Sequence, residues 1–389
     1  MSNLRKKITF TKPDNIIILG FFIYLISRII FLMLSVSLRL QPFLSYDDVF
    51  FYDPISVEQL NPLKYYLIHK EIFYVIAAIC NKLRINELLT GTRLFNFTIY
   101  FLCCICIRRI CIRLNYNKNI SNKIFICFLV LPYYLFYSVS TYKDILCMYS
   151  VLALFDMYLS HRNKEKISLL NLIILSSALY FVRFGIFESF IALILGIELI
   201  EKKNYKKFGI LIFIITIGVV IFMNSNYSYV FMDKYNAYVL GGHSSKGSAG
   251  LLGKFEVTSI KNVYNIIPLV IYGQITPLPG TYMSEYLQSN SWGAMIGYFG
   301  FISAFLIPYF WDYIFCVNKN KHEKIIITFY ILWIISIMIT NPGTNRFLFF
   351  ITPIFYFISI NNLIRNFKKI YLLTSGLVCF TIPFIYLYI

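Results

Sequence analysis

The fold is decided by residues 16–38, which read IIILGFFIYLISRIIFLMLSVSL. This apolar run is longer than the hydrophobic segment of a signal peptide, and no small-residue cleavage site follows it. A run of such length is typical of a helix that crosses a bilayer. We therefore predict a retained membrane helix at this position rather than a cleaved leader.

The composition extends this prediction to the whole chain. Of the 389 residues, 58% are hydrophobic and only 14% are charged, and the mean hydropathy is +0.68. Soluble globular proteins do not reach such values, so we expect an all-α polytopic membrane protein with a single integral domain over residues 1–389. The nine cysteines and four histidines form no zinc motif in the sequence.

Apolar runs separated by short polar stretches predict about eleven transmembrane helices. We expect them over residues 15–38, 94–112, 124–140, 145–160, 168–183, 186–200, 208–224, 293–316, 325–340, 347–363 and 370–388. The sequence contains no internal repeat and no stretch that predicts a soluble domain.

The net charge of +18 is a topology signal. The basic residues lie in short clusters between apolar runs and not on one basic face, which argues against a nucleic-acid partner. The clusters fall at every second helix boundary: Arg5 to Lys12, Arg108 to Lys123, Arg162 to Lys166, Lys202 to Lys207, Lys319 to Lys324 and Arg365 to Lys369. By the positive-inside rule the amino terminus is cytoplasmic.

The two long loops, residues 39–93 and 225–292, then lie on the opposite side of the membrane. Residues 61–83 combine helical apolar spacing with several charges, which favours an interfacial helix. Residues 260–280 are apolar but interrupted by three prolines, so they predict an interfacial or re-entrant segment.

An acidic pair begins the first of these loops, in the stretch LSYDDVFFYDP at residues 44–54. Asp47 and Asp48 are adjacent carboxylates followed by aromatic side chains, which is typical of the wall of a site. Solvation of the loop or capping of a helix is the alternative for this pair. Asp53 precedes a proline and is interpreted as a turn residue.

Other polar side chains fall in short turns on the same outer side. They are Lys143 and Asp144, Arg183, and Arg346. A carboxylate can accept a proton from a hydroxyl while cations stabilise a departing phosphate, so this set suits transfer from a phosphate-linked donor. The alternatives are an ion pair between Lys143 and Asp144, and headgroup anchoring by the two arginines.

Three further residues are candidate ligands for a phosphate. Arg28 lies midway along the first span, where an unpaired charge is costly, so it must face protein or water. A functional role and a structural pairing are both open for it. His69 and His243 lie on the outer side, but each is a lone histidine. Asp156, Glu198 and Asp312 lie near cytoplasmic helix ends, where we expect their carboxylates to reach water.

The order of these features resembles the GT-C superfamily of polyprenyl-phosphate-dependent glycosyltransferases. The stretches that carry the resemblance are YDDVFFYDP (46–54), NPLKYYLIHKEIFYVIAAICNKL (61–83), TRLFNFTIYFLCCICIRRI (92–110) and LPYYLFYSVSTYKDILCMYSVLAL (131–154), with weaker support from NPGTNRFLFFITPIFYF (341–357). The resemblance implies that Asp47 or Asp48 is the general base and that Asp144 binds a metal or orients the acceptor. A divalent metal is therefore an open alternative, and no other cofactor is implied.

Within that superfamily, this sequence resembles the Wzy-type polymerases of bacterial O-antigen or capsule synthesis, because no stretch of it predicts a soluble carboxy-terminal domain. That resemblance implies an inner-membrane enzyme that joins undecaprenyl-pyrophosphate-linked repeat units on the periplasmic face. Its partners would be the lipid-linked glycan donor and acceptor, membrane lipid and, as a candidate, a chain-length regulator protein. A transferase adding a single sugar, a lipid-linked glycan flippase and a scaffolding membrane protein are the alternatives.

Overall fold

The computed structural model describes residues 14–37, 72–85, 90–139, 144–182, 186–201, 305–315 and 352–371, together with single turns or residues at 206–207, 210, 323–324, 327–328, 330, 373–374 and 377. All regular secondary structure in these ranges is helical, and they contain no strand. The predicted all-helical class is therefore confirmed for the described part of the chain.

Most described helices coincide with the predicted apolar spans. They are α1 (Asn15–Ser37), α5 (Ile72–Lys82), α6 (Thr90–Arg113), α7 (Lys118–Leu129), α8 (Pro132–Val139), α9 (Asp144–Arg162), α10 (Leu169–Val182), α11 (Ile186–Glu201) and α19 (Thr352–Arg365). The predicted spans at 208–224, 325–340 and 370–388 lie almost wholly outside the described residues. So does most of the span at 293–316, of which 305–315 is described and helical.

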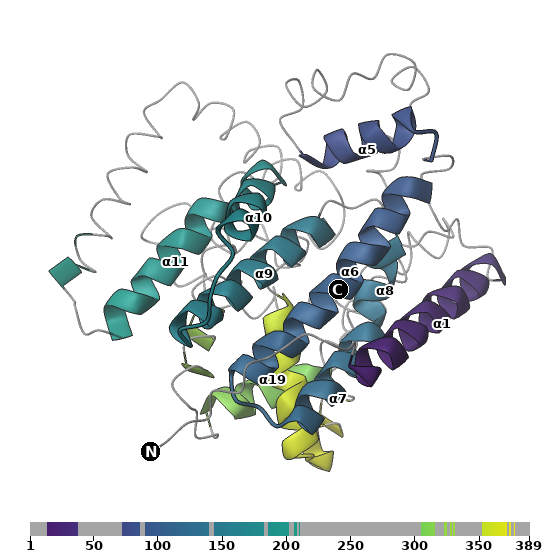
Figure 1. The fold of residues 1–389 in the computed structure, drawn as a ribbon. Helices are drawn as coiled ribbons and strands as arrows, with labels where there is room; N and C mark the ends of the chain where they lie inside the picture. Colours follow the sequence, from purple (N-terminus) through teal and green to yellow (C-terminus); the bar gives the residue numbers. More distant parts are fainter. Residues whose placement is uncertain are drawn as a thin grey trace, which may run out of the picture.

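Helix α6 lies at the centre of the described bundle (Figure 1). It packs against α9, α7 and α8, and it also contacts α1 and α5. Its side chains Tyr100, Cys103, Cys104 and Cys111 are almost fully buried. Small thiol side chains let neighbouring helices approach closely, and these cysteines are free and not cross-linked.

The close approach of α1 to α7 depends on a glycine. A Cβ atom at Gly20 would lie 2.4 Å from Cε1 of Phe125 and 3.0 Å from a methyl group of Leu129. Because Phe125 and Leu129 are fully buried, neither can move away cheaply. Gly20 therefore fixes the register in which α1 lies along α7.

Three helices end in the same way, with a residue other than glycine in the left-handed region. The φ angles are 55° at Arg84, 62° at Asn115 and 58° at Lys164. After each, the following amide bonds back to a carbonyl five residues earlier, as in the bond from Tyr116 N to Cys111 O at 3.1 Å. This is the Schellman arrangement, which satisfies carbonyls that a helix end leaves open. It turns the chain sharply after α5, α6 and α9.

One predicted helix is broken in the structure. The sequence predicted a continuous span over 124–140, but α7 ends at Leu129 and α8 begins at Pro132. The residue Val130 leaves the helix with φ −107° and ψ 6°. Pro132 has no amide hydrogen and restricts the residue before it, so the helix cannot continue through this point. The interpretation of this span as an unbroken helix was wrong.

The outward faces of two helices are apolar and exposed. On α1 these side chains include Phe22, Ile26, Ile30 and Met33, and α10 exposes a second such face that begins at Leu169. Among the described helices, α6 is long and apolar enough to cross a membrane, and its apolar window is 56% buried inside the structure. Shorter apolar helical stretches occur at Asn15–Ile30 and Leu169–Tyr180.

Helix α5 lies across the end of the bundle at which α6 begins (Figure 1). It packs against α6 and α10, and the backbone carbonyl of Ile85 lies so close to Gly91 that a Cβ atom there would be 2.7 Å away. The sequence predicted an interfacial helix over 61–83, and α5 forms the second half of that range. Residues 61–71 lie outside the described part of the chain.

Candidate functional site

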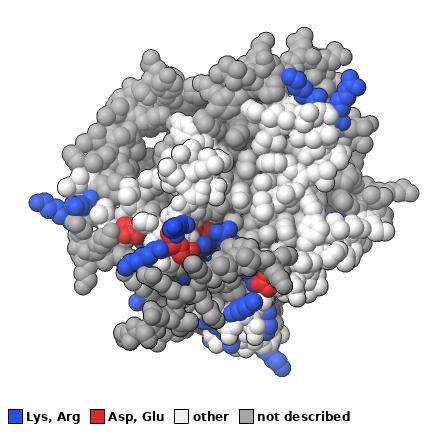
Figure 2. Space-filling model, in the orientation of Figure 1, with Lys and Arg blue, Asp and Glu red and all other residues white. Residues whose placement is uncertain are grey.

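Charged side chains gather at one end of the bundle, which we call the charged end and define by Asp14, Arg108, Arg113, Asp156 and Asp312. In Figure 2 the acidic side chains and several basic ones lie together over the lower part of the view, while most of the described surface above them is uncharged. Asp14 lies directly before α1, and the other four lie in the last two turns of α6, α9 and the 305–315 helix. The alternating basic clusters predicted that such boundaries share one side.

The centre of the charged end is the carboxylate of Asp156. Its side chain is 2% exposed and receives Arg109 Nη2 at 2.8 Å together with Nη1 of Arg113. Residues 109 and 113 are one helical turn apart, so both arginines reach the same acceptor. Arg113 also contacts Glu165 at 3.0 Å, which the turn after α9 directs back toward α6. The expectation that Asp156 reaches water was wrong, because two arginines compensate its burial.

A second ion pair joins α1 to α6 and α7. Arg108 Nη2 lies 2.5 Å from Asp14 Oδ2, and its Nε donates to Asn122 Oδ1 at 2.9 Å. The hydrogen bond from Arg108 lowers the pKa of Asp14 below its usual value, against a smaller opposing effect of burial. Lys118 adds a longer contact to the same carboxylate at 3.7 Å. Arg108 is thus a buried cation with a carboxylate partner.

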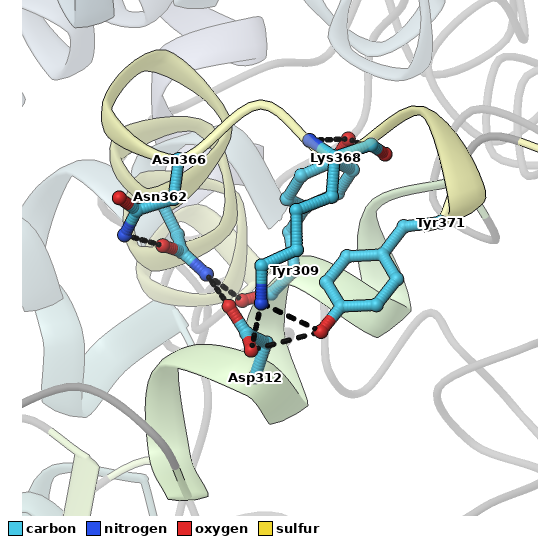
Figure 3. Close-up of polar contacts among 6 residues, drawn as sticks. All are labelled: Tyr309, Asp312, Asn362, Asn366, Lys368 and Tyr371. Carbon is cyan, nitrogen blue, oxygen red and sulfur yellow. Dashed lines mark hydrogen bonds and ion pairs between the residues drawn. The ribbon is translucent and has the colours of Figure 1, made fainter.

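A third group fixes the 305–315 helix to the end of α19 (Figure 3). The carboxylate of Asp312 accepts from Lys368 Nζ at 2.9 Å, Tyr371 OH at 2.9 Å and Asn362 Nδ2 at 3.0 Å. The hydrogen bonds that Lys368 makes with Tyr371 and Asp312 raise the pKa of its ammonium group. Asp312 was also expected to reach water, and it too is buried among donors. Because every oxygen is satisfied, we interpret this group as structural.

The turn after α6 carries a polar contact into the same end. Tyr116 donates its hydroxyl hydrogen to Glu323 and lies 3.2 Å from the hydroxyl of Tyr313. The guanidinium of Arg365 lies 4.8 Å from the centre of the Tyr116 ring. These contacts join α19 and residues 313 and 323 to the core around α6. No motif in the sequence predicts these contacts.

Arg28 is a buried cation in a different environment, away from the charged end. Its residue surface is 1% exposed. Nε donates to Ser138 Oγ at 3.0 Å, and Nη1 donates to Ser27 Oγ at 2.9 Å and to the backbone carbonyl of Leu129. The guanidinium lies 4.0 Å from the ring centre of Tyr24 and 5.1 Å from that of Tyr100. No carboxylate of the described residues forms an ion pair with it.

These contacts place Arg28 at the break between α7 and α8. Because α7 stops there, its last carbonyls lack their usual partners four residues on, and those of Cys127 and Phe128 accept from the amides of Val130 and Leu131 instead. Arg28 donates to the carbonyl of Leu129, and Tyr100 OH donates to that of Phe128 at 2.5 Å. Nη2 of Arg28 is buried and has no hydrogen-bond partner among the described residues. The carbonyls of Phe128 and Leu129 at the break are therefore hydrogen-bonded, whereas Nη2 of Arg28 is not.

Asp144 is the other predicted site residue that the structure describes. It is the first residue of α9 and is fully buried. A carboxylate is favourable at a helix amino terminus, which is its structural role in α9. The four residues 140–143 connect α8 to Asp144, and Ser138, the partner of Arg28, lies one residue before the end of α8. Asp144 therefore follows the Arg28 partner Ser138 by six positions in the sequence.

The remaining predicted site residues lie outside the described part of the chain. They are Asp47, Asp48, His69, Lys143, Arg183, His243 and Arg346. Among the described residues, no group of three or more His, Cys, Asp or Glu side chains could hold a metal ion.

Sequence reasoning missed the partners of Arg28. Ser138, Tyr24 and Tyr100 carry no motif, and their convergence depends on how three helices pack. One signal was present: Pro132 inside an apolar run predicts a break, and a break needs donors for its open carbonyls. A buried arginine in a neighbouring apolar span is a suitable donor.

Comparison with known proteins adds no family: no protein-family model, no curated protein and no solved structure matches this chain.

Proposed function

We propose that this chain is a polytopic membrane protein of about eleven transmembrane helices, with the charged end facing the cytoplasm. The exposed apolar faces of α1 and α10 support this proposal, because contiguous apolar surface of this kind is costly in water and favourable in lipid. The pairing of helix ends into one charged end supports it as well. In this arrangement α5 lies on the periplasmic side, as an interfacial helix would.

The function we propose is that of a bacterial inner-membrane glycosyltransferase that acts on undecaprenyl-linked glycan at the periplasmic face. The observation that carries it is the buried carboxylate of Asp144 at the end of α9 opposite the ion pair of Asp156. A carboxylate there can orient or deprotonate an acceptor hydroxyl in a water-poor site. Polymerisation of repeat units is the preferred form, and addition of a single sugar requires the same chemistry.

The proposed reaction is an inverting displacement. An acceptor hydroxyl loses its proton to Asp47 or Asp48 and attacks the anomeric carbon of the lipid-linked donor, and the bond to the phosphate oxygen breaks. Lys143, Arg183 and Arg346 are the predicted cations that stabilise the leaving phosphate. Asp144 is the predicted supporting residue, through the acceptor or through a divalent metal.

A flippase for lipid-linked glycan is the second candidate. The break between α7 and α8 favours it, because discontinuous helices with nearby polar side chains are frequent at transporter sites. The sequence predicted one continuous helix over residues 124–140, and its break brings α7 and α8 closer to this pattern.

Deleting the gene and examining the surface glycan separates these functions. A polymerase predicts single unpolymerised repeats at the cell surface, and a single-sugar transferase predicts a polymer of normal length that lacks one sugar. A flippase predicts repeats that accumulate on the cytoplasmic side of the membrane. Normal glycan in the deletion strain would contradict all three.

The residue-level test is restoration of the glycan by variants of the gene. We expect Asp144→Asn, Asp47→Asn and Asp48→Asn to lower product at least about a hundredfold if each acts in acid–base chemistry, with unchanged protein level in the membrane. Asp53→Asn is the matched control, because its interpretation as a turn residue predicts near-normal product. Full activity in all three test variants would contradict the transferase.

A further inference from the structure

The guanidinium of Arg28 is a buried cation with one amino group, Nη2, that has no hydrogen-bond partner among the described residues. We infer that its free amino group, Nη2, binds a phosphate oxygen of an anionic lipid-linked ligand at the break between α7 and α8. This inference rests on the proposed function for the identity of the ligand, whereas the anion site itself rests on the contacts of Arg28.

The hydrogen bonds of Arg28 use only some of the donors of its guanidinium. A guanidinium carries five N–H groups. Nε and Nη1 are directed at Ser138, Ser27 and the carbonyl of Leu129, which uses three of them. Two hydrogens remain on Nη2, in a position where burial prevents bulk water from accepting them. A buried donor without an acceptor costs free energy, so a ligand that accepts is strongly favoured there.

The guanidinium of Arg28 also carries a positive charge that needs compensation. Among the described residues, the partners of Arg28 are hydroxyls, a carbonyl and two aromatic faces, and none of these carries a full negative charge. A cation in an apolar interior is costly unless it meets an anion. A neutral ligand would satisfy the N–H groups but leave the charge uncompensated. A phosphate satisfies both, and its bond to a guanidinium is charge-assisted.

Aromatic rings surround the guanidinium of Arg28. The rings of Tyr24 and Tyr100 lie on the guanidinium and provide apolar contact beside the charge. An amphiphile with a phosphate and an unsaturated hydrocarbon chain matches this combination.

Access to a residue that is 1% exposed requires a movement of the surrounding helices. Helix α8 has eight residues and is separated from α7 at Val130 and Leu131, so it can shift without distorting α7. The hydrogen bond from Arg28 to Ser138 holds α8 in its present position. Ligand binding would replace or rearrange this contact.

The test compares farnesyl phosphate with farnesol, which has the same chain and no charge, on the full-length protein in neutral detergent. We expect the wild type to bind farnesyl phosphate at least about tenfold more tightly than farnesol, measured by calorimetry, since a charge-assisted bond is added. Arg28→Gln should lose this preference. Arg28→Met, which also removes the charge, carries the test if the first variant does not fold.

The matched control is Arg108→Gln, which removes another buried arginine whose charge is already paired with Asp14. It should keep the tenfold preference. Equal affinity of the wild type for the two ligands, or an unchanged preference in folded Arg28 variants, would overturn the inference. Inorganic phosphate and vesicles of phosphatidylglycerol identify the source: Arg28-dependent binding of either, without preference for farnesyl phosphate, overturns the polyprenyl ligand.

These results are separable from the proposed function. If Asp144→Asn leaves the glycan intact but phosphate binding depends on Arg28, the transferase proposal fails and the phosphate site remains. If glycan synthesis depends on the carboxylates but Arg28 variants bind farnesyl phosphate normally, the transferase remains and this site is wrong.

Discussion

Arg108 and Arg28 are two buried arginines with opposite surroundings. Arg108 lies at the charged end, where Asp14 neutralises it and Asn122 takes a further hydrogen. Arg28 lies among neutral oxygens and aromatic rings, with Nη2 unbonded to any described residue. The difference indicates that burial alone does not decide the role of a cation. Arg108 is complete as a structural residue, and Arg28 is not.

The same contrast extends to how each region stabilises the fold. The charged end joins helix ends through charge pairs, each of which spans two or three helices. The α7–α8 break is stabilised by donors from α1 and α6 to the carbonyls of Leu129 and Phe128. Residues that reduce stability while meeting no structural need are frequent at functional sites. Stability measurements can therefore test which of the two regions is structural.

The largest effect should come from Asp156→Leu. This change leaves Arg109 and Arg113 without their shared carboxylate, and Arg113 is largely buried. Removing one side of a buried ion pair costs about 3 kcal/mol in the free energy of unfolding. Thermal unfolding of the purified protein in detergent measures it.

The control for this change is Glu165→Gln, which removes the exposed partner of the same Arg113. It should cost about 0.5 kcal/mol or less. If the two variants lose the same stability, Asp156 is not the centre of the charged end.

A smaller effect is expected for Arg28→Met, because two terms oppose each other. The carbonyl of Leu129 and the hydroxyl of Ser138 lose their donor, while a costly unpaired charge leaves the interior. We expect a net loss of about 1 kcal/mol in the free energy of unfolding, or a small gain. A loss as large as that of Asp156→Leu would show that Arg28 is mainly structural and would remove the contrast with Arg108.

The smallest expected effect is the loss, at acidic pH, of the stability that the ion pair between Asp14 and Arg108 contributes. Because the pKa of Asp14 is lowered in the folded protein, the pair stabilises the fold above the unfolded pKa of 3.8, and this contribution is lost as the pH falls through the lower folded pKa. The Asp14 side chain is 36% exposed, so solvent screening limits the contribution to about 0.5 kcal/mol. The difference between wild type and Asp14→Asn, measured from pH 7 to pH 2, should shrink at the acid end.

The sequence predicted the helices better than the site. Apolar runs gave the positions of α1, α9, α10 and α11 to within about two residues, because long apolar periodicity dominates local structure. It failed at residues 124–140, where Pro132 overrides an otherwise continuous apolar pattern.

Of the candidate site, the sequence identified Arg28 and Asp144 as unusual by charge alone. It could not predict what Arg28 contacts, since Ser138 and Tyr100 are 110 and 72 positions away in the chain and meet it only through packing. It also misjudged Asp156, because the two arginines that pair with it come from another helix.

The sharp turns after α6 and α9 have a consequence for how the chain folds. Helices α6, α7, α8 and α9 follow one another, and α6 packs on the other three within residues 90–162, closer along the chain than the contact of α19 with α7. Such local contacts form quickly. We expect this block to assemble while later residues are still being synthesised, and α19, which packs on α7, to join last. The carboxy-terminal part would then complete a structure whose centre already exists.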